Sequence, residues 1–318
     1  MAYRKEDMTR VVQAFAHKRN EALGRAKARM EALYREHPEF REIDSALAKT
    51  GMRLVEEVLK GKEGITERVA AVRAENEALQ KDRADLLALY GYAPDHTEVQ
   101  YECPLCNDTG YTGEKMCLCM KKALAQLGLE RSGLAPLART QSFDTFDLKY
   151  YRDGDRATME KNLSFCRQYA DKFSPLSPSL LFLGKTGLGK THLSTSIAAV
   201  TVEKGTEVIY CSAPRLFLSL SDEKFGRAPL IPSADIHSAE LLIIDDLGTE
   251  NPSDLNVNFL YSIVNTRMVS GKPTIINTNL TVKEIKERYT DRIASRLLGE
   301  YIVLPFVGSD IRMQKIGL

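Results

Sequence analysis

The sequence predicts an α/β fold in which a parallel sheet is covered by helices on both faces. Three observations support this prediction. Strand-like apolar runs alternate with helix-like runs over residues 140–318, a glycine-rich turn follows the first of these strands, and residues 1–95 have a helix-forming composition. Alternation of this kind is typical of a parallel sheet with helices on both faces. With 318 residues, 43% of them hydrophobic, the chain is long enough for roughly two domains with a sizeable core.

The first 95 residues are rich in Ala, Glu, Arg, Lys and Leu, which favour helices. Breaks are expected at Pro38, at Gly51 and at the pair Gly61 and Gly64, which leaves about three helices. The last helix carries a heptad seam with two polar members, formed by Ile65, Val69, Val72, Asn76, Leu79, Arg83 and Leu86. Such a seam fits a helical hairpin that packs on itself or a coiled-coil surface for the helices of a partner, and neither excludes the other.

Composition and charge narrow the classes of partner. The net charge of +1 gives no support for a nucleic-acid partner. Residues 1–30 carry eight Lys or Arg against three Asp or Glu, which fits either a binding surface or a solvated helix face. No apolar run approaches the roughly 18 residues of a membrane span, and residues 1–6 lack the apolar core of a signal peptide. We therefore expect a cytoplasmic protein without a membrane partner.

Residues 96–135 are predicted to form a small cysteine module. Cys103 and Cys106 form a C-x₂-C pair, and Cys117 and Cys119 form a tighter C-x-C pair after ten intervening residues. The segment between the pairs is rich in turn residues and suits a loop that closes on a metal ion. Four thiolates would complete the coordination of Zn²⁺, so we expect a structural zinc site. Redox-active thiols and incidental cysteines are the alternatives.

Residues 136–318 are predicted to form a nucleotide-binding domain. Its strands are expected at Ser179–Gly184, Glu207–Ala213, Leu241–Leu247, Pro273–Leu280 and Tyr301–Phe306. The turn after the first strand fits the phosphate-binding pattern G-x-x-x-x-G-K-[ST] and consists of Gly184, Lys185, Thr186, Gly187, Leu188, Gly189, Lys190 and Thr191. Because a strand precedes it and a helix follows it, backbone N–H groups and the helix N-terminus converge on a polyphosphate. A chance glycine-rich turn is the alternative.

Individual roles follow from this pattern. Lys190 should reach the β- and γ-phosphates of ATP, and the Thr191 hydroxyl should hold Mg²⁺. The strand that ends in Asp245 and Asp246 lies 55 residues after Lys190 and has the form of a Walker B strand. Asp245 should hold Mg²⁺ directly or through water. Asp246 should orient and polarise the attacking water.

Further polar residues follow the last two strands. Asn279 is the first candidate to hold the attacking water near the γ-phosphate, and Asn277 is the second. Arg292 and Arg296 lie four residues apart on a predicted helix. They form either a solvated face or an arginine finger that reaches the γ-phosphate of a neighbouring subunit. Arg312, after the last strand, is placed to contact the nucleotide of its own chain.

Taken together, these motifs resemble the AAA+ ATPases of the DnaC/DnaI helicase-loader type, a group that includes the transposition helper IstB. The resemblance rests on the P-loop, the Asp-Asp pair, the Thr-Asn strand end, Arg-Ile-Ala-Ser-Arg-Leu and Ser-Asp-Ile-Arg, and it covers residues 140–318. It implies that Asp246 is the catalytic carboxylate, Asn279 the sensor-1 residue, Arg296 the finger acting in trans and Arg312 the sensor-2 residue.

The resemblance also implies an activity and partners. Loaders of this family bind a hexameric replicative helicase and deliver it to single-stranded DNA. Residues 1–135 would then bind the helicase, an inserted helix within 214–236 would contact DNA, and residues 142–147 would lie near the adenine. Only six residues follow Arg312, so a truncated lid is expected, which argues against a strong self-assembled ring while leaving self-association through the ATPase domain open.

The sequence leaves alternatives open for the rate of ATP hydrolysis and for the biological role. Asp246 stands where this superfamily usually has Glu, which is one methylene longer, so slow hydrolysis stimulated by a partner or by DNA is expected. A transposition helper ATPase has the same core, and the zinc module on a helical arm favours the loader. A nucleotide-gated adaptor that binds ATP with little hydrolysis is the third interpretation.

Overall fold

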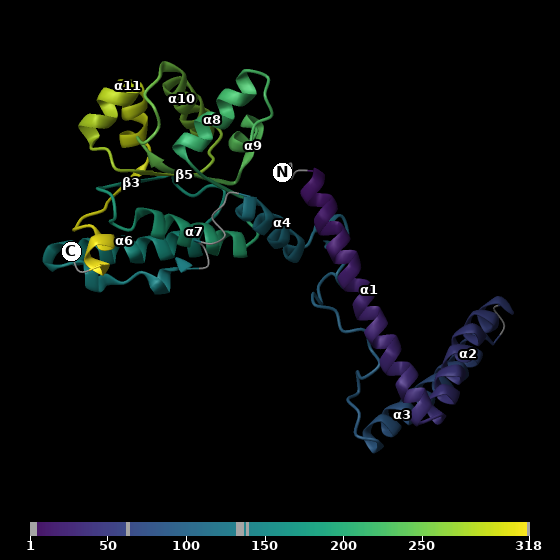
Figure 1. Cartoon of the computed structure of the whole chain (residues 1–318). Coiled ribbons are helices and arrows are strands. Elements are labelled where there is room, and N and C mark those ends of the chain that lie inside the picture. Colours follow the sequence, from purple (N-terminus) through teal and green to yellow (C-terminus); the bar gives the residue numbers. More distant parts are fainter. Residues whose placement is uncertain (1–4, 62–63, 132–136, 138–139, 317–318) are drawn as a thin grey trace. The chain divides into compact units, whose positions relative to one another are not determined.

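The structure is a computed structural model, drawn in Figure 1, and it describes residues 5–61, 64–131, 137 and 140–316. The chain forms two compact units. One consists of residues 12–112, and the other of the segments 1–11 and 113–318. The predicted boundary between residues 135 and 136 lies outside the described residues, so the three-part division of the sequence stays a prediction. Within the described residues, no helix is both long enough and apolar enough to cross a membrane.

Three helices account for the predicted helical region. They are α1 (Lys5–Glu36), α2 (Glu39–Leu59) and α3 (Ile65–Leu89). The expected breaks at Pro38 and at Gly61 with Gly64 separate them, and Gly64 has a left-handed φ of 62° directly before α3. The expected break at Gly51 is wrong, because this residue lies inside α2. A glycine within a helix costs about 1 kcal/mol relative to alanine, and the packing of α2 on α3 offsets that cost.

The heptad seam of α3 faces α2. Across this hairpin, Asn76 Nδ2 donates to Thr50 Oγ1 at 2.5 Å, and Arg83 Nε donates to Asp44 Oδ1 at 2.7 Å. Both polar members of the seam therefore have polar partners on α2, and Val72 of the same seam is buried. The hairpin interpretation is confirmed, and the seam itself is occupied.

The second unit is built around a five-stranded sheet in which every pair of neighbours is parallel. Its strands are β3 (Leu180–Leu183), β4 (Val208–Ser212), β5 (Leu241–Leu247), β6 (Thr274–Thr278) and β7 (Ile302–Pro305). Each lies within a strand that the sequence predicted. The spatial order β4-β5-β6-β3-β7 places β3, which leads into the P-loop, between β6 and β7.

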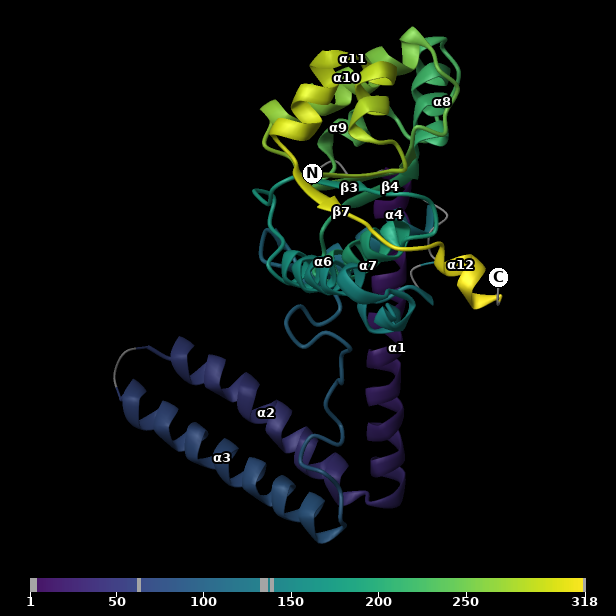
Figure 2. The same ribbon diagram turned by 90° about the vertical axis from the view of Figure 1, so that its left-hand side faces the viewer.

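Helices cover both faces of this sheet, as predicted. Figures 1 and 2 show one face covered by α4 (Leu118–Arg131), α6 (Asp153–Asp171) and α7 (Lys190–Glu203), and the other by α8 (Ala213–Lys224), α9 (Ser233–Ser238), α10 (Asp254–Val269) and α11 (Val282–Gly299). The remaining elements are the strands β1 (Tyr111–Thr112) and β2 (Lys115–Met116), the 3₁₀ turns η1 (Phe143–Thr145) and η2 (Leu148–Tyr150), and α12 (Ile311–Lys315).

The apolar core has one layer on each side of the sheet. Alternate residues of the strands pack on α6 and α7 or on α8, α10 and α11, because successive side chains of a strand point to opposite faces. The carboxyl ends of β3, β5 and β6 meet at one edge of the sheet. In open parallel sheets this edge is where ligands bind.

Candidate nucleotide-binding site

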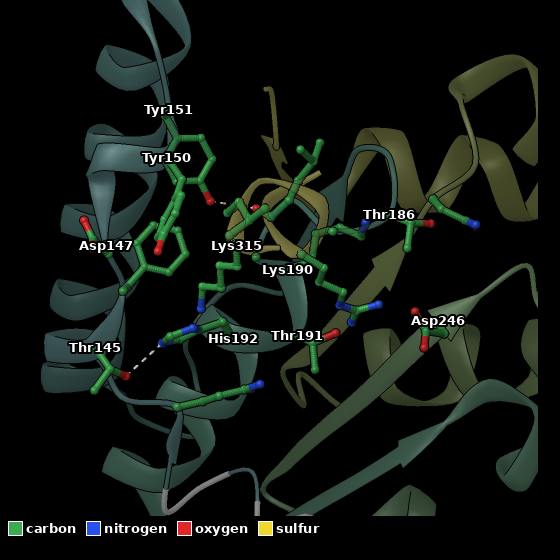
Figure 3. A pocket seen from close by; sticks show the side chains of 18 of the residues that line it. Thr145, Asp147, Tyr150, Tyr151, Thr186, Lys190, Thr191, His192, Asp246 and Lys315 are labelled. Carbon is green, nitrogen blue, oxygen red and sulfur yellow. Dashed lines mark hydrogen bonds between the residues drawn. The ribbon is translucent and has the colours of Figure 1, made fainter. Parts of the chain in front are cut away.

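A pocket of about 300 Å³ lies at this edge of the sheet (Figure 3). Its lining includes the P-loop from Thr186 to Thr191, together with Asp246, Asn279 and Arg312. Figure 3 shows the aromatic residue Tyr150 on one side of the pocket and Thr186 and Asp246 on the other, with Lys190 between them. The pocket therefore joins an aromatic end to a charged end.

The glycines of the P-loop allow other segments to approach closely. Gly187 and Gly189 have left-handed φ values of 78° and 86°. A Cβ atom on Gly187 would lie 2.0 Å from Asp310 Oδ1, and one on Gly184 would lie 2.3 Å from the carbonyl oxygen of Phe306. Any larger side chain at these two positions would collide with the segment that follows β7.

Lys190 opens α7 and lies in the curve of the loop. Its Nζ donates to the carbonyl oxygens of Gly184 and Lys185 at 2.6 and 2.7 Å. The pKa of Lys190 is lowered, mainly because the side chain is buried. The negative charges of Asp246 and Asp245 oppose this decrease. The ammonium group thus places a positive charge within the loop, at the position where the sequence pattern predicts that a polyphosphate binds.

Asp245 is a buried carboxylate directly behind the P-loop. The Thr191 hydroxyl donates to its Oδ2 at 3.0 Å, the Tyr210 hydroxyl donates to Oδ2 at 2.7 Å, and Asn277 Nδ2 donates to Oδ1 at 2.7 Å. Burial and Asp245 raise the pKa of Tyr210 well above its ordinary value, so this phenol stays protonated and donates. The adjoining oxygens of Thr191 and Asp245 are of the kind that Mg²⁺ binds, so this donor set fits the ion that accompanies ATP.

Asp246 is exposed and lines the pocket, whereas Asp245 is buried. A register shift between Ile244 and Leu247 interrupts the pairing of β5 with β6, and Asp246 has a left-handed φ of 55°. Bulges often lie next to active sites, where they re-aim a side chain. Burial, followed by Asp245, raises the pKa of Asp246 despite the opposing charges of Lys190 and Arg312. Asp246 is therefore a stronger proton acceptor than an ordinary aspartate.

The two candidate amides of β6 have different surroundings. Asn279 lines the pocket. Asn277 is fully buried beneath Asp245 and also donates to Ser194 Oγ at 2.8 Å. Asn279 thus remains the candidate for contact with a water molecule, and Asn277 supports the carboxylate. The sequence did not predict the part played by Tyr210, although a polar residue on the buried face of a strand is a signal of such a contact.

The segment after β7 docks on the P-loop and carries Arg312 into the pocket. The N–H of Ile311 donates to the carbonyl oxygen of Gly187 at 3.0 Å. The side chain of Asp310 caps α12 by accepting the N–H of Arg312 at 2.8 Å. Arg312 therefore lies near the nucleotide-binding loop of its own chain, as the sequence predicts.

The other end of the pocket is aromatic. Its lining includes Phe146, Tyr150, Tyr151, His192 and Lys315. The Tyr151 hydroxyl donates to the carbonyl oxygen of Leu188 at 3.0 Å, and the ammonium group of Lys315 lies 5.5 Å from the centre of the Tyr150 ring. Aromatic walls suit a flat base. Phe146 belongs to the segment expected near adenine, whereas Tyr150, Tyr151 and Lys315 match no motif and were not predicted.

Arg292 and Arg296 do not belong to the described lining of this pocket. Arg296 packs on α10, where its Nε donates to Asn265 Oδ1 at 3.2 Å and its guanidinium group lies 4.9 Å from the centre of the Tyr261 ring. Arg292 is exposed one turn earlier on α11. Both arginines thus lie outside the described lining of the pocket on their own chain.

The four cysteines of the predicted metal module come together. The sulfur atoms of Cys103, Cys106, Cys117 and Cys119 all lie within 4.8 Å of one another. In a tetrahedral zinc site with Zn–S distances of about 2.3 Å, the sulfur atoms are about 3.8 Å apart. The carboxylate of Asp108 accepts the N–H groups of Glu102 and Cys103 at 2.9 and 2.8 Å, which fixes the first turn. This donor set fits Zn²⁺.

Comparison with known proteins places the pocket within one family. The family described as IstB-like ATP binding protein matches residues 126–315. Replicative helicase loader DnaC of Buchnera aphidicola (subsp. Acyrthosiphon pisum) is 29% identical over 182 residues, which cover 56% of this chain and 72% of that relative. The loader DnaC of Escherichia coli (strain K12) is 26% identical over 195 residues, covering 60% of this chain and 77% of that relative. The family match contains every described pocket residue and none of the unit 12–112.

Two solved structures are also similar to part of this chain. The crystal structure of the DnaC helicase loader is 22% identical, with a TM-score of 0.48, and covers 54% of this chain and 100% of that one. The crystal structure of DnaI is 19% identical, with a TM-score of 0.45, and covers 57% of this chain and 98% of that one.

We predict that Gly187→Ala weakens ATP binding by about tenfold or more. The left-handed conformation costs a non-glycine residue about 1–2 kcal/mol, and the new Cβ would push Asp310 from its capping position beside Arg312. Titration with a fluorescent ATP analogue measures the effect. Gly226→Ala is the matched control, because its φ is 73° and no atom lies within 4 Å of its Cβ position. Equal affinity in both variants would contradict the role assigned to Gly187.

We also predict about one zinc ion per chain in protein purified under reducing conditions. Cys106→Ser should lose the metal, because three thiolates hold zinc less tightly than four. Cys166→Ala should keep it, because Cys166 is a buried thiol outside the cluster. Elemental analysis of the purified proteins measures the ratio. A ratio near zero in the reduced wild-type protein would rule out the zinc site.

Proposed function

Because the chain belongs to the family of IstB-like ATP-binding proteins, we propose that it is an ATP-dependent loader that places a replicative DNA helicase on single-stranded DNA. ATP binding follows from the family. The names of its relatives, replicative helicase loaders, support the specific role. The observation that carries the proposal is the convergence of the P-loop, Asp246, Asn279 and Arg312 in one pocket.

The P-loop binds the phosphates in this proposal. Its backbone N–H groups and the N-terminus of α7 surround the β- and γ-phosphates. Lys190 exchanges its two carbonyl partners for phosphate oxygens, which are better acceptors because they are charged. Thr191 and Asp245 would hold Mg²⁺, which would neutralise charge on the phosphates during transfer. The aromatic end of the pocket receives the base.

Hydrolysis then depends on Asp246 and Asn279. Both line the pocket beside the P-loop, so they are placed to orient a water molecule toward the γ-phosphate. The exposed carboxylate of Asp246 is the group there that can accept a proton from that water. Because aspartate is shorter than glutamate, its reach is smaller, and we propose slow turnover that helicase or DNA stimulates.

Two arginines are proposed to contact nucleotides, Arg312 in its own chain and Arg296 in a neighbouring chain. Arg312 lies in the pocket of its own chain and stabilises the nucleotide there. Arg296 lies outside that pocket, on α11. We assign it to the nucleotide of a neighbouring subunit, in which it acts as an arginine finger. Hydrolysis would then require at least two associated chains.

The helical unit is the proposed binding site for the helicase. Its seam is already occupied, but Met52, Val55 and Leu59 on α2 are 67%, 59% and 79% exposed. Their steps of three and four place them along one stripe of the helix, which suits contact with a partner's helix. The cysteine cluster would rigidify the chain between Cys103 and Cys119. In this proposal residues 1–135 bind the helicase, and the pocket binds and hydrolyses ATP.

The proposed contact with DNA lies at the end of α8. The apolar face of this helix is buried through Leu216 and Phe217, whereas Phe225 is 63% exposed directly after the helix. Lys224 and Arg227 are near Phe225 in the sequence, and the Arg227 guanidinium group, which also pairs with Asp222 at 2.7 Å, lies 5.9 Å from the centre of its ring. An exposed aromatic ring beside basic groups suits stacking of a base and contact with phosphates.

We predict that Lys190→Ala abolishes ATP-dependent loading. Without the ammonium group the loop loses its charge for the phosphates, so loading should fall to the level measured without nucleotide. The assay mixes the protein with the replicative helicase of the same organism and circular single-stranded DNA coated with single-strand-binding protein, and then measures helicase on DNA. Lys185→Ala is the matched control, because its side chain is exposed and only its carbonyl oxygen contacts Lys190.

Two outcomes of this assay would contradict the proposal. If Lys190→Ala loads as well as wild type, ATP does not drive loading. If wild type binds ATP but neither binds nor loads the helicase, the loader role fails. The second candidate, a transposition helper ATPase, follows from the family's resemblance to IstB, and in that case a transposase would be captured in place of the helicase.

We further predict that Arg296→Ala lowers ATP turnover by about a hundredfold or more, since arginine fingers contribute about 10³–10⁵ to kcat. This variant keeps its own P-loop, whereas Lys190→Ala keeps its finger but lacks a working site. Mixing the two inactive variants should restore part of the turnover when the finger acts in trans. Arg292→Ala tests the exposed neighbour. Full activity of Arg296→Ala at every protein concentration would rule out its role.

A further inference from the structure

Tyr210 and Asn277 both donate hydrogen bonds to the carboxylate of Asp245. Tyr210 comes from β4 and Asn277 from β6, the two neighbours of β5 in the sheet. Ile243 pairs with Tyr210 on one side and with Ile275 on the other. Because side chains alternate along a strand, Tyr210, Asp245 and Asn277 all point to the face that α7 covers.

The donors around Asp245 use its capacity to accept hydrogen bonds. An ionised carboxylate has about four acceptor positions. Asn277 Nδ2 and the N–H of Asp246 donate to Oδ1 at 2.7 and 3.0 Å, and the Tyr210 hydroxyl donates to Oδ2 at 2.7 Å. The last position, on Oδ2, accepts the Thr191 hydroxyl at 3.0 Å. The part of the carboxylate that faces the P-loop therefore points at the second oxygen that would hold Mg²⁺.

Stability alone does not explain these two polar residues. Tyr210 is 2% exposed and Asn277 is fully buried, in strands whose other residues on this face are mostly apolar. Among the described atoms, Asn277 Oδ1 has no hydrogen-bond partner. A buried acceptor without a partner is costly, and such a group in a native protein calls for an explanation. Here the amide is oriented so that its Nδ2 donates hydrogen bonds to Asp245 and Ser194.

We propose that Tyr210 is a positioning residue for MgATP, which acts through Asp245 with Asn277 as a second support. Tyr210 holds Oδ2 so that its other acceptor position faces Thr191, and Asn277 holds Oδ1 from the opposite strand. Removal of the phenol hydroxyl allows the carboxylate to turn and weakens its contact with the metal. This inference rests on the ATP-binding part of the proposed function and is independent of the helicase.

Tyr210→Phe tests the proposal, because it removes one oxygen and keeps the ring. Binding of a fluorescent ATP analogue is measured as a function of Mg²⁺ concentration and again in excess EDTA. The Mg²⁺ concentration for half-maximal binding should rise about tenfold, as is typical when a residue that orients a metal ligand is lost. Affinity in EDTA should equal that of wild type, because the P-loop and the aromatic end of the pocket are unchanged.

Tyr169→Phe is the matched control. Tyr169 is also a buried tyrosine of the same unit, and its hydroxyl donates to the carbonyl oxygen of Pro178 at 2.8 Å, far along the sheet from the pocket. This variant should lose a similar hydrogen bond, with a similar fall in Tm, and keep the wild-type Mg²⁺ dependence. A rise in both variants would show a general effect of stability and would overturn the proposal.

Asn277→Ala provides a second variant that removes the other support, and it should shift the Mg²⁺ dependence in the same direction. If wild type binds the analogue and neither Tyr210→Phe nor Asn277→Ala changes the Mg²⁺ requirement, the positioning role is wrong while the proposed function stands. If wild type itself binds no analogue in Mg²⁺ or in EDTA, the proposed function fails together with this inference.

Discussion

The burial of one carboxylate is the constraint on which the rest of the site depends. Asp245 is 6% exposed, and an ionised group so far from water is stable only when hydrogen bonds compensate its lost hydration. Those bonds come from Tyr210 on β4, Asn277 on β6 and Thr191 on α7. Three elements must therefore hold a fixed register relative to β5. The same register brings the P-loop, the bulge at Asp246 and the end of β6 to a common edge of the sheet.

The loop after Asp246 extends this constraint to the helix that carries the proposed finger. The carboxylate of Glu250 accepts the N–H of Gly248 at 2.9 Å and is also held by Arg288 and Tyr289 of α11. α11 is kinked directly afterwards at Thr290, where φ is 74°, and Arg296 lies beyond the kink. On the opposite side of the pocket, α12 docks on Gly187 through its first residues. Two segments outside the P-loop are thus tied to the nucleotide-binding edge.

Sequence patterns predicted the features that depend on residues close together in the chain. The strands follow from apolar runs, and the P-loop and Asp245 follow from motifs in which spacing and residue type leave few alternatives. Gly51 failed as a helix break because tertiary packing offset a small local cost. Tyr210 was not predicted because its partner, Asp245, lies 35 residues away on a neighbouring strand. The sequence of neither segment alone shows that the two strands pair. Tyr150 and Lys315 are far apart in the sequence and meet only through the tertiary fold.

The decisive experiment is a crystal structure with Mg²⁺ and a non-hydrolysable ATP analogue. We expect the triphosphate to lie in the P-loop, oxygens of Thr191 and Asp245 to bind the ion directly or through water, and the Tyr210 hydroxyl to stay within about 3 Å of Asp245 Oδ2. An ion held by other groups, with the Asp245 carboxylate turned away from Thr191 or released from Tyr210, would contradict it.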